Sequence, residues 1–218
     1  MMLMRIKGIE QEFKDVPGEI YNLSIENPSF LYTCIRAFCL EDDETIKILE
    51  NYKEVPLSKN VLFIKDLFDL NPNSKKILTI IYKQAQTSYM NDERKNKLVR
   101  IQEEICELLD DISMDFAYPM AFDRIIGIDK IMTNSSFCFN YDQQKSFKDG
   151  FLMYLKIIQE ISKTKFIITT NLNSLLSENE IEEIKKELSL IGLTIINISF
   201  SHQSIKNTTI IDSDWCEF

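Results

Sequence analysis

The sequence predicts an α/β fold with an inserted helical segment. Residues 165–200 have the pattern of a buried strand, a capped helix and a second buried strand, which favours parallel strands joined by a right-handed crossover. Between residues 71 and 150, apolar residues recur mainly at helical spacing. We therefore expect an α/β head domain of residues 1–70 and 151–218, with a mostly parallel sheet flanked by helices, and an α-helical leg domain of residues 71–150.

The first part of the chain has the pattern of short strands around one helix. A Pro17-Gly18 turn separates two strand-like segments, so a hairpin is expected there, followed by a helix with apolar helical spacing. We expect these strands to form one side of the head's sheet. The expected strands are residues 5–13, 19–25, 46–49 and 61–64, and the expected helix is residues 28–40.

The leg is expected to begin with a helix at Asn71-Pro72, because asparagine caps helices and proline suits their first position. After a polar interruption at residues 91–93, apolar residues recur at spacings of three and four, as in a narrow coiled-coil seam. These are Leu98, Ile101, Ile105, Leu108 and Ile112. Pro119 should end this helix near Tyr118, and a short helix is expected to follow up to residue 131.

The last part of the chain returns to the α/β pattern. A helix whose apolar face runs from Phe147 to Ile161 precedes the strand at residues 166–170. Ser177 and Glu180 have the spacing of a capping box, and Gly192 is placed to end the helix before the strand at residues 193–200.

The glycines argue against phosphate chemistry in this core. A phosphate-binding loop needs closely spaced glycines, because only backbone without Cβ atoms curls tightly around phosphate oxygens. The chain has five glycines, all far apart, and neither GxxxxGK[ST] nor GxGxxG is present. We therefore interpret the core as a scaffold.

Composition bounds the function classes further. Hydrophobic residues make up 44% of 218 residues, enough for a packed core, and the net charge of -9 opposes indiscriminate binding to nucleic acid or anionic membranes. Five scattered cysteines without a CxxC pair predict reduced, mostly buried thiols. With no apolar stretch of membrane-spanning length, a cytoplasmic protein with no membrane partner is expected.

Positive charge is concentrated in the first half of the leg. Such a stripe would neutralise DNA phosphates despite the acidic total. The alternative, which a single chain favours, is a solvated helix face. Assembly of several copies around a common axis would concentrate the positive potential. The candidate DNA-binding residues are Lys75, Lys76, Lys83, Arg94, Lys95, Lys97 and Arg100.

Three carboxylates, Asp110, Asp111 and Asp115, come together where the long helix should end. Carboxylates beside free loop carbonyls suit a calcium or magnesium ion, and the alternative is a solvated helix end. The single histidine, His202, excludes a metal cage built from histidines.

Three segments in this order resemble the small accessory adaptation protein of type II-A CRISPR systems. They are VLFIKDLFDLNPNSKKILTIIYKQ, the helical insert through LLDDISMDFAYP, and FIITTNLNSLLSENEIEEIKKELSLIGLTIINISF. The resemblance covers residues 61–200, and the N-terminal part agrees only in outline.

The resemblance implies a degenerate P-loop-NTPase-like head with a helical leg, and a homotetrameric ring around double-stranded DNA. It further implies sequence-independent binding of linear DNA ends, stabilisation by calcium without any nucleotide cofactor, no catalysis, and a role in spacer acquisition beside the integrase proteins and the RNA-guided nuclease. The chain departs from the family at Ala117 and Pro119, where relatives commonly carry carboxylates, which should weaken or move a calcium site.

Two other function classes stay open at this point. One is a metal-dependent nuclease or nucleotide hydrolase with an α/β core, using Asp110, Asp111 and Asp115. The other is a structural protein that docks a partner helix on the seam of residues 98–112.

Overall fold

The computed structural model describes residues 1–140, 146–200, 208–214 and 216–218. The chain divides into two compact units. The head unit comprises Met1–Asn71 and Asp142–Phe218, and the leg unit comprises Pro72–Tyr141. Each unit is described separately below.

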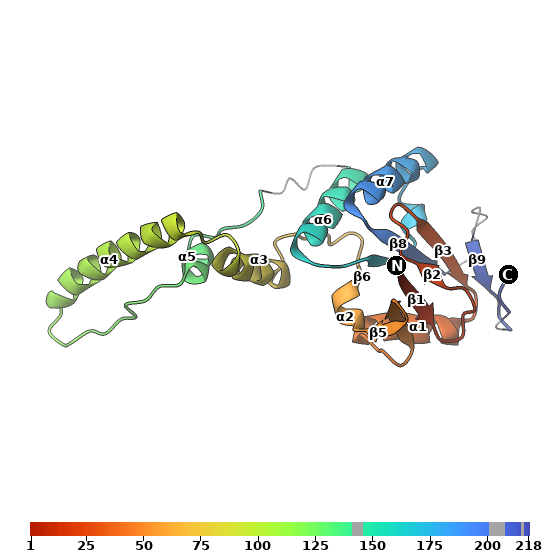
Figure 1. Ribbon diagram of the computed structural model, residues 1–218, viewed down its shortest axis with the longest axis horizontal. Helices are drawn as coiled ribbons and strands as arrows, with labels where there is room; N and C mark the ends of the chain where they lie inside the picture. The colour runs from red at the N-terminus through yellow and green to blue at the C-terminus, as the bar shows by residue number, and fades with distance from the viewer. Residues whose placement is uncertain (141–145, 201–207, 215) are drawn as a thin grey trace. The chain divides into compact units, whose positions relative to one another are not determined.

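The head unit is built on a five-stranded parallel sheet (Figure 1). Every neighbouring pair of its strands is parallel. Across the sheet the strands are β6 (Val61–Phe63), β7 (Phe166–Thr170), β8 (Thr194–Ser199), β3 (Ile20–Ile25) and β9 (Thr208–Ile211). The inner strands β7 and β8 are rich in isoleucine and buried on both faces, as is typical of parallel sheets.

Helices cover both faces of this sheet. One face packs against α6 (Phe147–Ile161) and α7 (Glu178–Ile191), with Phe151, Leu155 and Ile184 fully buried against it. The other face packs against α1 (Pro28–Leu40). The predicted class, a mixed α/β fold with a parallel sheet flanked by helices, is confirmed.

The N-terminal strands form a second, antiparallel sheet, which corrects the expectation of one sheet. Its strands, in order, are β2 (Phe13–Lys14), β1 (Met2–Ile6), β4 (Ile46–Glu50) and β5 (Lys53–Val55), and the short helix α2 (Leu57–Asn60) follows β5. Its apolar residues share a core with α1 and one face of the parallel sheet.

The hairpin expected at Pro17-Gly18 is also wrong, because β3 pairs with β8 and β9 and not with the strands before it. Gly18, at φ 91°, donates its N–H to the carbonyl of Leu193, and the Thr194 hydroxyl donates to the carbonyl of Val16. The turn thus carries the chain from one sheet to the other. The strand that β3 pairs with is therefore decided by contacts with Leu193 and Thr194, which are distant in the sequence.

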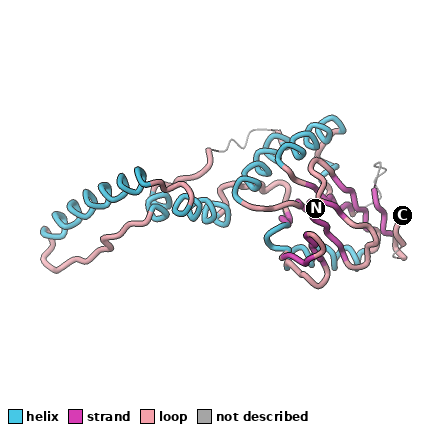
Figure 2. The backbone as a smooth tube through the Cα atoms, viewed as in Figure 1, coloured by secondary structure: helices cyan, strands magenta, loops and turns pink. Residues whose placement is uncertain are grey.

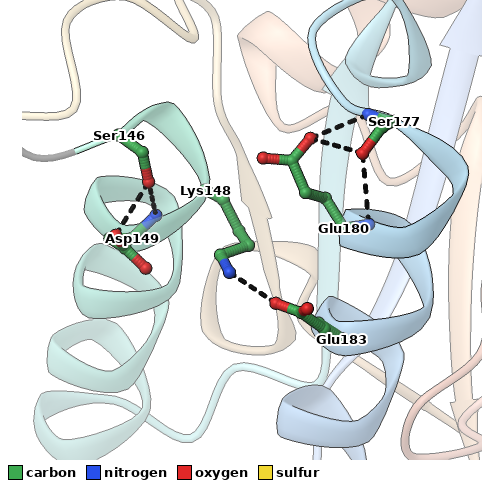
Figure 3. A network of polar contacts seen from close by, with 6 residues as sticks. All are labelled: Ser146, Lys148, Asp149, Ser177, Glu180 and Glu183. Carbon is green, nitrogen blue, oxygen red and sulfur yellow. Dashed lines mark hydrogen bonds and ion pairs between the residues drawn. The ribbon is translucent and has the colours of Figure 1, made fainter.

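The capping signals around α7 are confirmed. The Ser177 N–H donates to Glu180 at 2.9 Å, and the Ser177 hydroxyl accepts from the Glu180 N–H at 3.4 Å, completing the capping box (Figure 3). Gly192 ends the helix at φ 73°, a left-handed conformation that favours glycine. Lys148 of α6 forms an ion pair with Glu183 of α7 in the same view.

The leg unit contains three helices: α3 (Lys75–Thr87), α4 (Asp92–Met114) and α5 (Ile128–Asn134). The first begins at Lys75, later than predicted from Asn71-Pro72, and Ser74 directly precedes it. Asn73 lies just before this start and contacts a distant part of the leg. Its amide donates to the Phe139 carbonyl at 3.0 Å and accepts from the Phe139 N–H at 2.8 Å. The short helix α5 likewise begins well after Pro119.

All five cysteines are free thiols, as predicted, but only Cys34 is fully buried. The expectation of mostly buried thiols was therefore wrong. Among the described residues, no helix is long and apolar enough to cross a membrane.

Candidate nucleic-acid interface

The three candidate cations on α3 are exposed side chains of a helix that lacks acidic residues. Lys75, Lys76 and Lys83 all face solvent, and α3 contains no aspartate or glutamate. Lys76 and Lys83 are seven residues apart, so they lie on the same side of the helix, two turns from each other. No ion pair within the described chain neutralises any of the three.

The other four candidates lie in the first half of α4 and are also exposed. Arg94, Lys97 and Arg100 follow each other at a spacing of three, which places them along one side of the helix. The Arg94 guanidinium donates to the carbonyl of Tyr89 at 2.6 Å, and Lys95 lies 3.5 Å from Asp92. The charged ends of Lys97 and Arg100 have no ion-pair partner among the described residues.

Helix stability does not explain where these cations lie. The N-terminal end of a helix carries a partial positive charge, so lysine or arginine in the first turn is unfavourable by some tenths of a kcal/mol. Nevertheless, Lys75 and Lys76 begin α3, and Arg94 and Lys95 lie in the first turn of α4. An anionic ligand at this surface would give a reason for the arrangement.

Charge changes sign along α4. Its segment 92–100 carries four cations and two carboxylates, whereas its segment 101–114 carries five carboxylates and no lysine or arginine. A polyanion would therefore be attracted to the first half of the helix and repelled by the second. All four α4 cations predicted from the sequence as DNA-binding residues lie in this basic half. The contrast with the acidic second half was not predicted.

The acidic half of α4 is tied to the segment that follows it. This segment runs back beside the helix (Figure 2), where the Gln102 amide and the Cys106 thiol donate to the carbonyls of Ile126 and Arg124. The Arg124 guanidinium donates two hydrogen bonds, of 2.8 and 3.1 Å, to the Asp110 carboxylate. The same bonds to Asp110 raise the pKa of Arg124.

The three candidate metal ligands are therefore not equivalent. Asp110 is occupied by Arg124, while Asp111 and Asp115 are exposed at the end of α4. Within the described part of the chain, no three histidine, cysteine, aspartate or glutamate residues are grouped so that they could hold a metal ion. His202 lies outside the described residues.

The apolar seam of α4 is largely uncovered, since no residue of this helix is buried. Leu108 is 58% exposed and Ile112 is 44% exposed, although both belong to the predicted coiled-coil-like seam. Nearby, Tyr118 and Ile125 are each 80% exposed. A helix with this pattern normally buries its seam against another helix.

In the head unit, sequence reasoning missed a polar network at the carboxyl ends of the parallel strands. Asn197 of β8 is 1% exposed, and its side-chain oxygen accepts from the Leu172 N–H at 2.8 Å and the Thr169 hydroxyl at 3.3 Å. Its amide donates to Asn22, which also accepts from the Asn173 amide at 2.7 Å. The network fixes the loop between β7 and α7. The sequence signal for this network was Asn197 itself, a polar residue within a strand that is rich in isoleucine.

Comparison with known proteins gives one family. The family model described as CRISPR-associated protein (Cas_Csn2) matches residues 40–215, which include the whole leg unit and most of the head unit. A search of curated proteins gave no match.

Proposed function

This chain belongs to the CRISPR-associated Cas_Csn2 family, which supports a role in CRISPR adaptation, and we propose that it is a sequence-independent, non-catalytic binder of linear double-stranded DNA ends. The exposed cations of α3 and α4 carry the proposal. They are spaced along helix surfaces, and most of them lack an acidic partner in the described chain. Lysine and arginine contacts of this kind are made to phosphates and do not read bases.

A homotetrameric ring is part of the proposal. The net charge of -9 means that one copy offers DNA little overall attraction. Several copies that turn their basic helices toward a common axis would produce a positive channel. The uncovered seam of α4 supports assembly, since self-association would remove Leu108 and Ile112 from water. The partners proposed from family membership are the CRISPR integrase proteins and the RNA-guided nuclease.

We also propose that the head is a degenerate P-loop-NTPase-like fold. Its all-parallel sheet and the helix α1, which directly follows the internal strand β3, support this relationship. At the junction between them, Asn27 caps α1 by accepting from the N–H groups of Ser29 and Phe30 at 3.1 Å. A side chain therefore occupies donors that a glycine-rich loop would offer to phosphate.

DNA binding is tested by measuring the affinity of the protein for a DNA duplex at several salt concentrations, for two double variants that remove the same number of charges. Replacing Lys76 and Lys83 by glutamine should weaken binding and reduce the slope of log K against log salt by about two, because each phosphate contact contributes about 0.9. Exposed lysines of the head unit provide the control: Lys53→Gln with Lys59→Gln should leave the slope unchanged. An unchanged slope for the α3 variant would contradict the assignment.

Linear and closed circular DNA separate end binding from binding along the duplex. Closed circular duplex should compete poorly with linear fragments of the same sequence, because a ring that loads at ends has no entry to a circle. Equal competition would contradict end binding. Nuclease and ATPase assays with added metal ions test the enzyme alternative. Turnover by the wild-type protein that disappears in Asp111→Ala would show that the protein is an enzyme and would contradict a non-catalytic function.

A partner-docking protein is the second candidate, and the exposed seam of α4 favours it specifically. Solution mass distinguishes the two functions. A stable monomer with no affinity for linear DNA would show that the seam serves another protein.

A further inference from the structure

An open cavity of about 580 Å³ lies at the carboxyl ends of β6 and β7 in the head unit. Ligands of open α/β sheets bind at this edge, and the volume is within the usual range for small-molecule sites. The segments that line it directly follow the two strands, and Phe200 follows β8. The lining residues that matter here are Lys65, Asp66, Phe68, Thr170, Asn171 and Phe200.

Phe68 is an exposed aromatic residue whose backbone is held in place. It is 83% exposed, yet Leu67 before it and Leu70 after it are both buried in the core. Its N–H donates to the Asp66 carboxylate at 2.8 Å, which holds the turn. An exposed ring beside a cavity gives a ligand an apolar surface to cover, and covering it removes that surface from water.

The opposite strand end contributes a second aromatic residue. Phe200 is 50% exposed, and its N–H donates to the Asn171 side chain at 3.4 Å. Asn171 has a left-handed conformation, with φ 53°, and its own N–H donates to the Ile198 carbonyl. The loop behind it is fixed by Asn197, so this wall of the cavity is organised before any ligand arrives.

The charge of the lining selects the kind of ligand. Lys65 and Asp66 are the only charged residues among the described lining residues, so their charges cancel. No glycine lines the cavity, and a polyphosphate would find neither net positive charge nor a backbone cradle. Two aromatic rings with a hydroxyl and amide groups at hand suit a flat, neutral heterocycle, because nucleobases stack on aromatic faces and hydrogen-bond through their edges.

We propose that this cavity binds an unpaired nucleobase at the end of a DNA duplex, stacked on Phe68. The inference rests on the proposed DNA-end function and extends it, since a fully complementary duplex has unpaired bases only where its ends fray or carry an overhang. It adds a contact in the head unit that is separate from the phosphate contacts proposed for α3 and α4.

The test compares a blunt linear duplex with the same duplex carrying one unpaired 2-aminopurine nucleotide at its 3′ end. The overhang should increase affinity about tenfold, as stacking of one base does, and 2-aminopurine fluorescence should fall on binding. Phe68→Ala should remove both effects while blunt-duplex affinity stays the same, and Phe68→Trp should retain them. Tyr32→Ala changes a 66% exposed aromatic residue away from the cavity and should change nothing.

The outcomes separate this inference from the proposed function. If both duplexes bind equally, or the overhang advantage survives Phe68→Ala, the cavity assignment is wrong while DNA-end binding stands. If neither duplex binds, the proposed function fails, and the cavity is judged by titration with free 2-aminopurine deoxyriboside. A fluorescence response that depends on Phe68 then supports a nucleobase site. The absence of such a response overturns the nucleobase assignment and leaves a protein side chain as the occupant.

Discussion

Asn197 shows how one buried polar residue shapes the edge of the parallel sheet. Its side chain joins β8 to the loop after β7 and to β3, within a strand whose other members include three isoleucines. A buried donor or acceptor without a partner costs about 1–3 kcal/mol, so the network is stable only while each member is present. The residue therefore links core stability to the position of the cavity loop.

Asn197→Ala should lower the free energy of unfolding by about 2–3 kcal/mol, because the buried Leu172 N–H and Thr169 hydroxyl lose their acceptor in the core. This corresponds to a fall in Tm of roughly 4–10 °C for a chain of this size. Urea or thermal unfolding measures it. The exposed Asn96→Ala variant should change stability by less than about 0.5 kcal/mol, and an equally small effect at Asn197 would contradict the network's importance.

Asp15 is a second residue whose environment predicts a measurable effect. Burial raises the pKa of Asp15, and the charges of Lys165 and the N-terminal amino group only partly oppose it. One of its carboxylate oxygens is buried and has no hydrogen-bond partner within the part of the chain that the structure describes. In the folded state this carboxyl holds its proton to a higher pH than in the unfolded chain. Its ionisation therefore destabilises the protein as pH rises above the ordinary value of 3.8.

Asp15→Asn should accordingly become more stabilising, relative to wild type, as pH rises from about 4 to 7. Since Asp15 is partly exposed, solvent screening keeps the gain small, about 1–3 °C in Tm at neutral pH. Thermal unfolding across this pH range measures the difference between variant and wild type. Glu160→Gln, at an exposed position, should give a flat difference. A gain for Asp15→Asn that is greatest at pH 4 would have the wrong sign.

At the scale of elements, two serines that directly precede helices differ in whether their side chains cap the helix. From the sequence alone, both would be expected to cap. Both precede a helix, but Ser177 accepts from the Glu180 N–H, whereas Ser74 makes no side-chain capping bond to α3. The backbone hydrogen bond from Ser177 also lowers the pKa of Glu180. Only the first serine should matter for stability.

Ser177→Ala should destabilise the protein by about 1 kcal/mol, the usual effect of losing a capping side chain. Ser74→Ala is the matched control and should have almost no effect, because no capping bond is lost. Chemical denaturation of both variants measures the contrast. Equal losses would show that the Ser177 bond is not what stabilises the start of α7.

At the scale of the whole molecule, the prediction concerns assembly. We expect the solution mass of the protein to exceed that of one 25.6 kDa chain, because α4 leaves its seam in water. We further expect the assembly to persist in EDTA, since Asp110 is held by Arg124 and the described residues do not gather a metal site. Light scattering with and without calcium measures both.

Replacing Leu108 and Ile112 by serine should shift the mass toward that of the monomer without unfolding the chain, because both side chains are already exposed. Replacing the 80% exposed Leu190 of α7 by serine is the control. An assembly that dissociates in EDTA and re-forms with calcium would revive the predicted metal site.

Much of the fold was predictable because its signals are local. The strand at residues 166–170, the capping box at Ser177 and the end of α7 at Gly192 each depend on a few neighbouring residues. Helix α1 was predicted at its observed bounds, Pro28–Leu40, for the same reason. The start of α3 was predicted too early, at Asn71-Pro72, and in the structure Asn73, just before the helix, bonds to Phe139, which is distant in the sequence.

The sequence by itself determined the α/β class, the helical middle segment and the positions of the exposed cations, since periodicity, caps and charge lie in contiguous residues. Only the tertiary structure decided that the strands form two sheets, that Arg124 occupies Asp110, and that Phe68, Asn171 and Phe200 line one cavity. These features join residues far apart in the chain. Long-range packing selects such partners, and no local pattern records that selection.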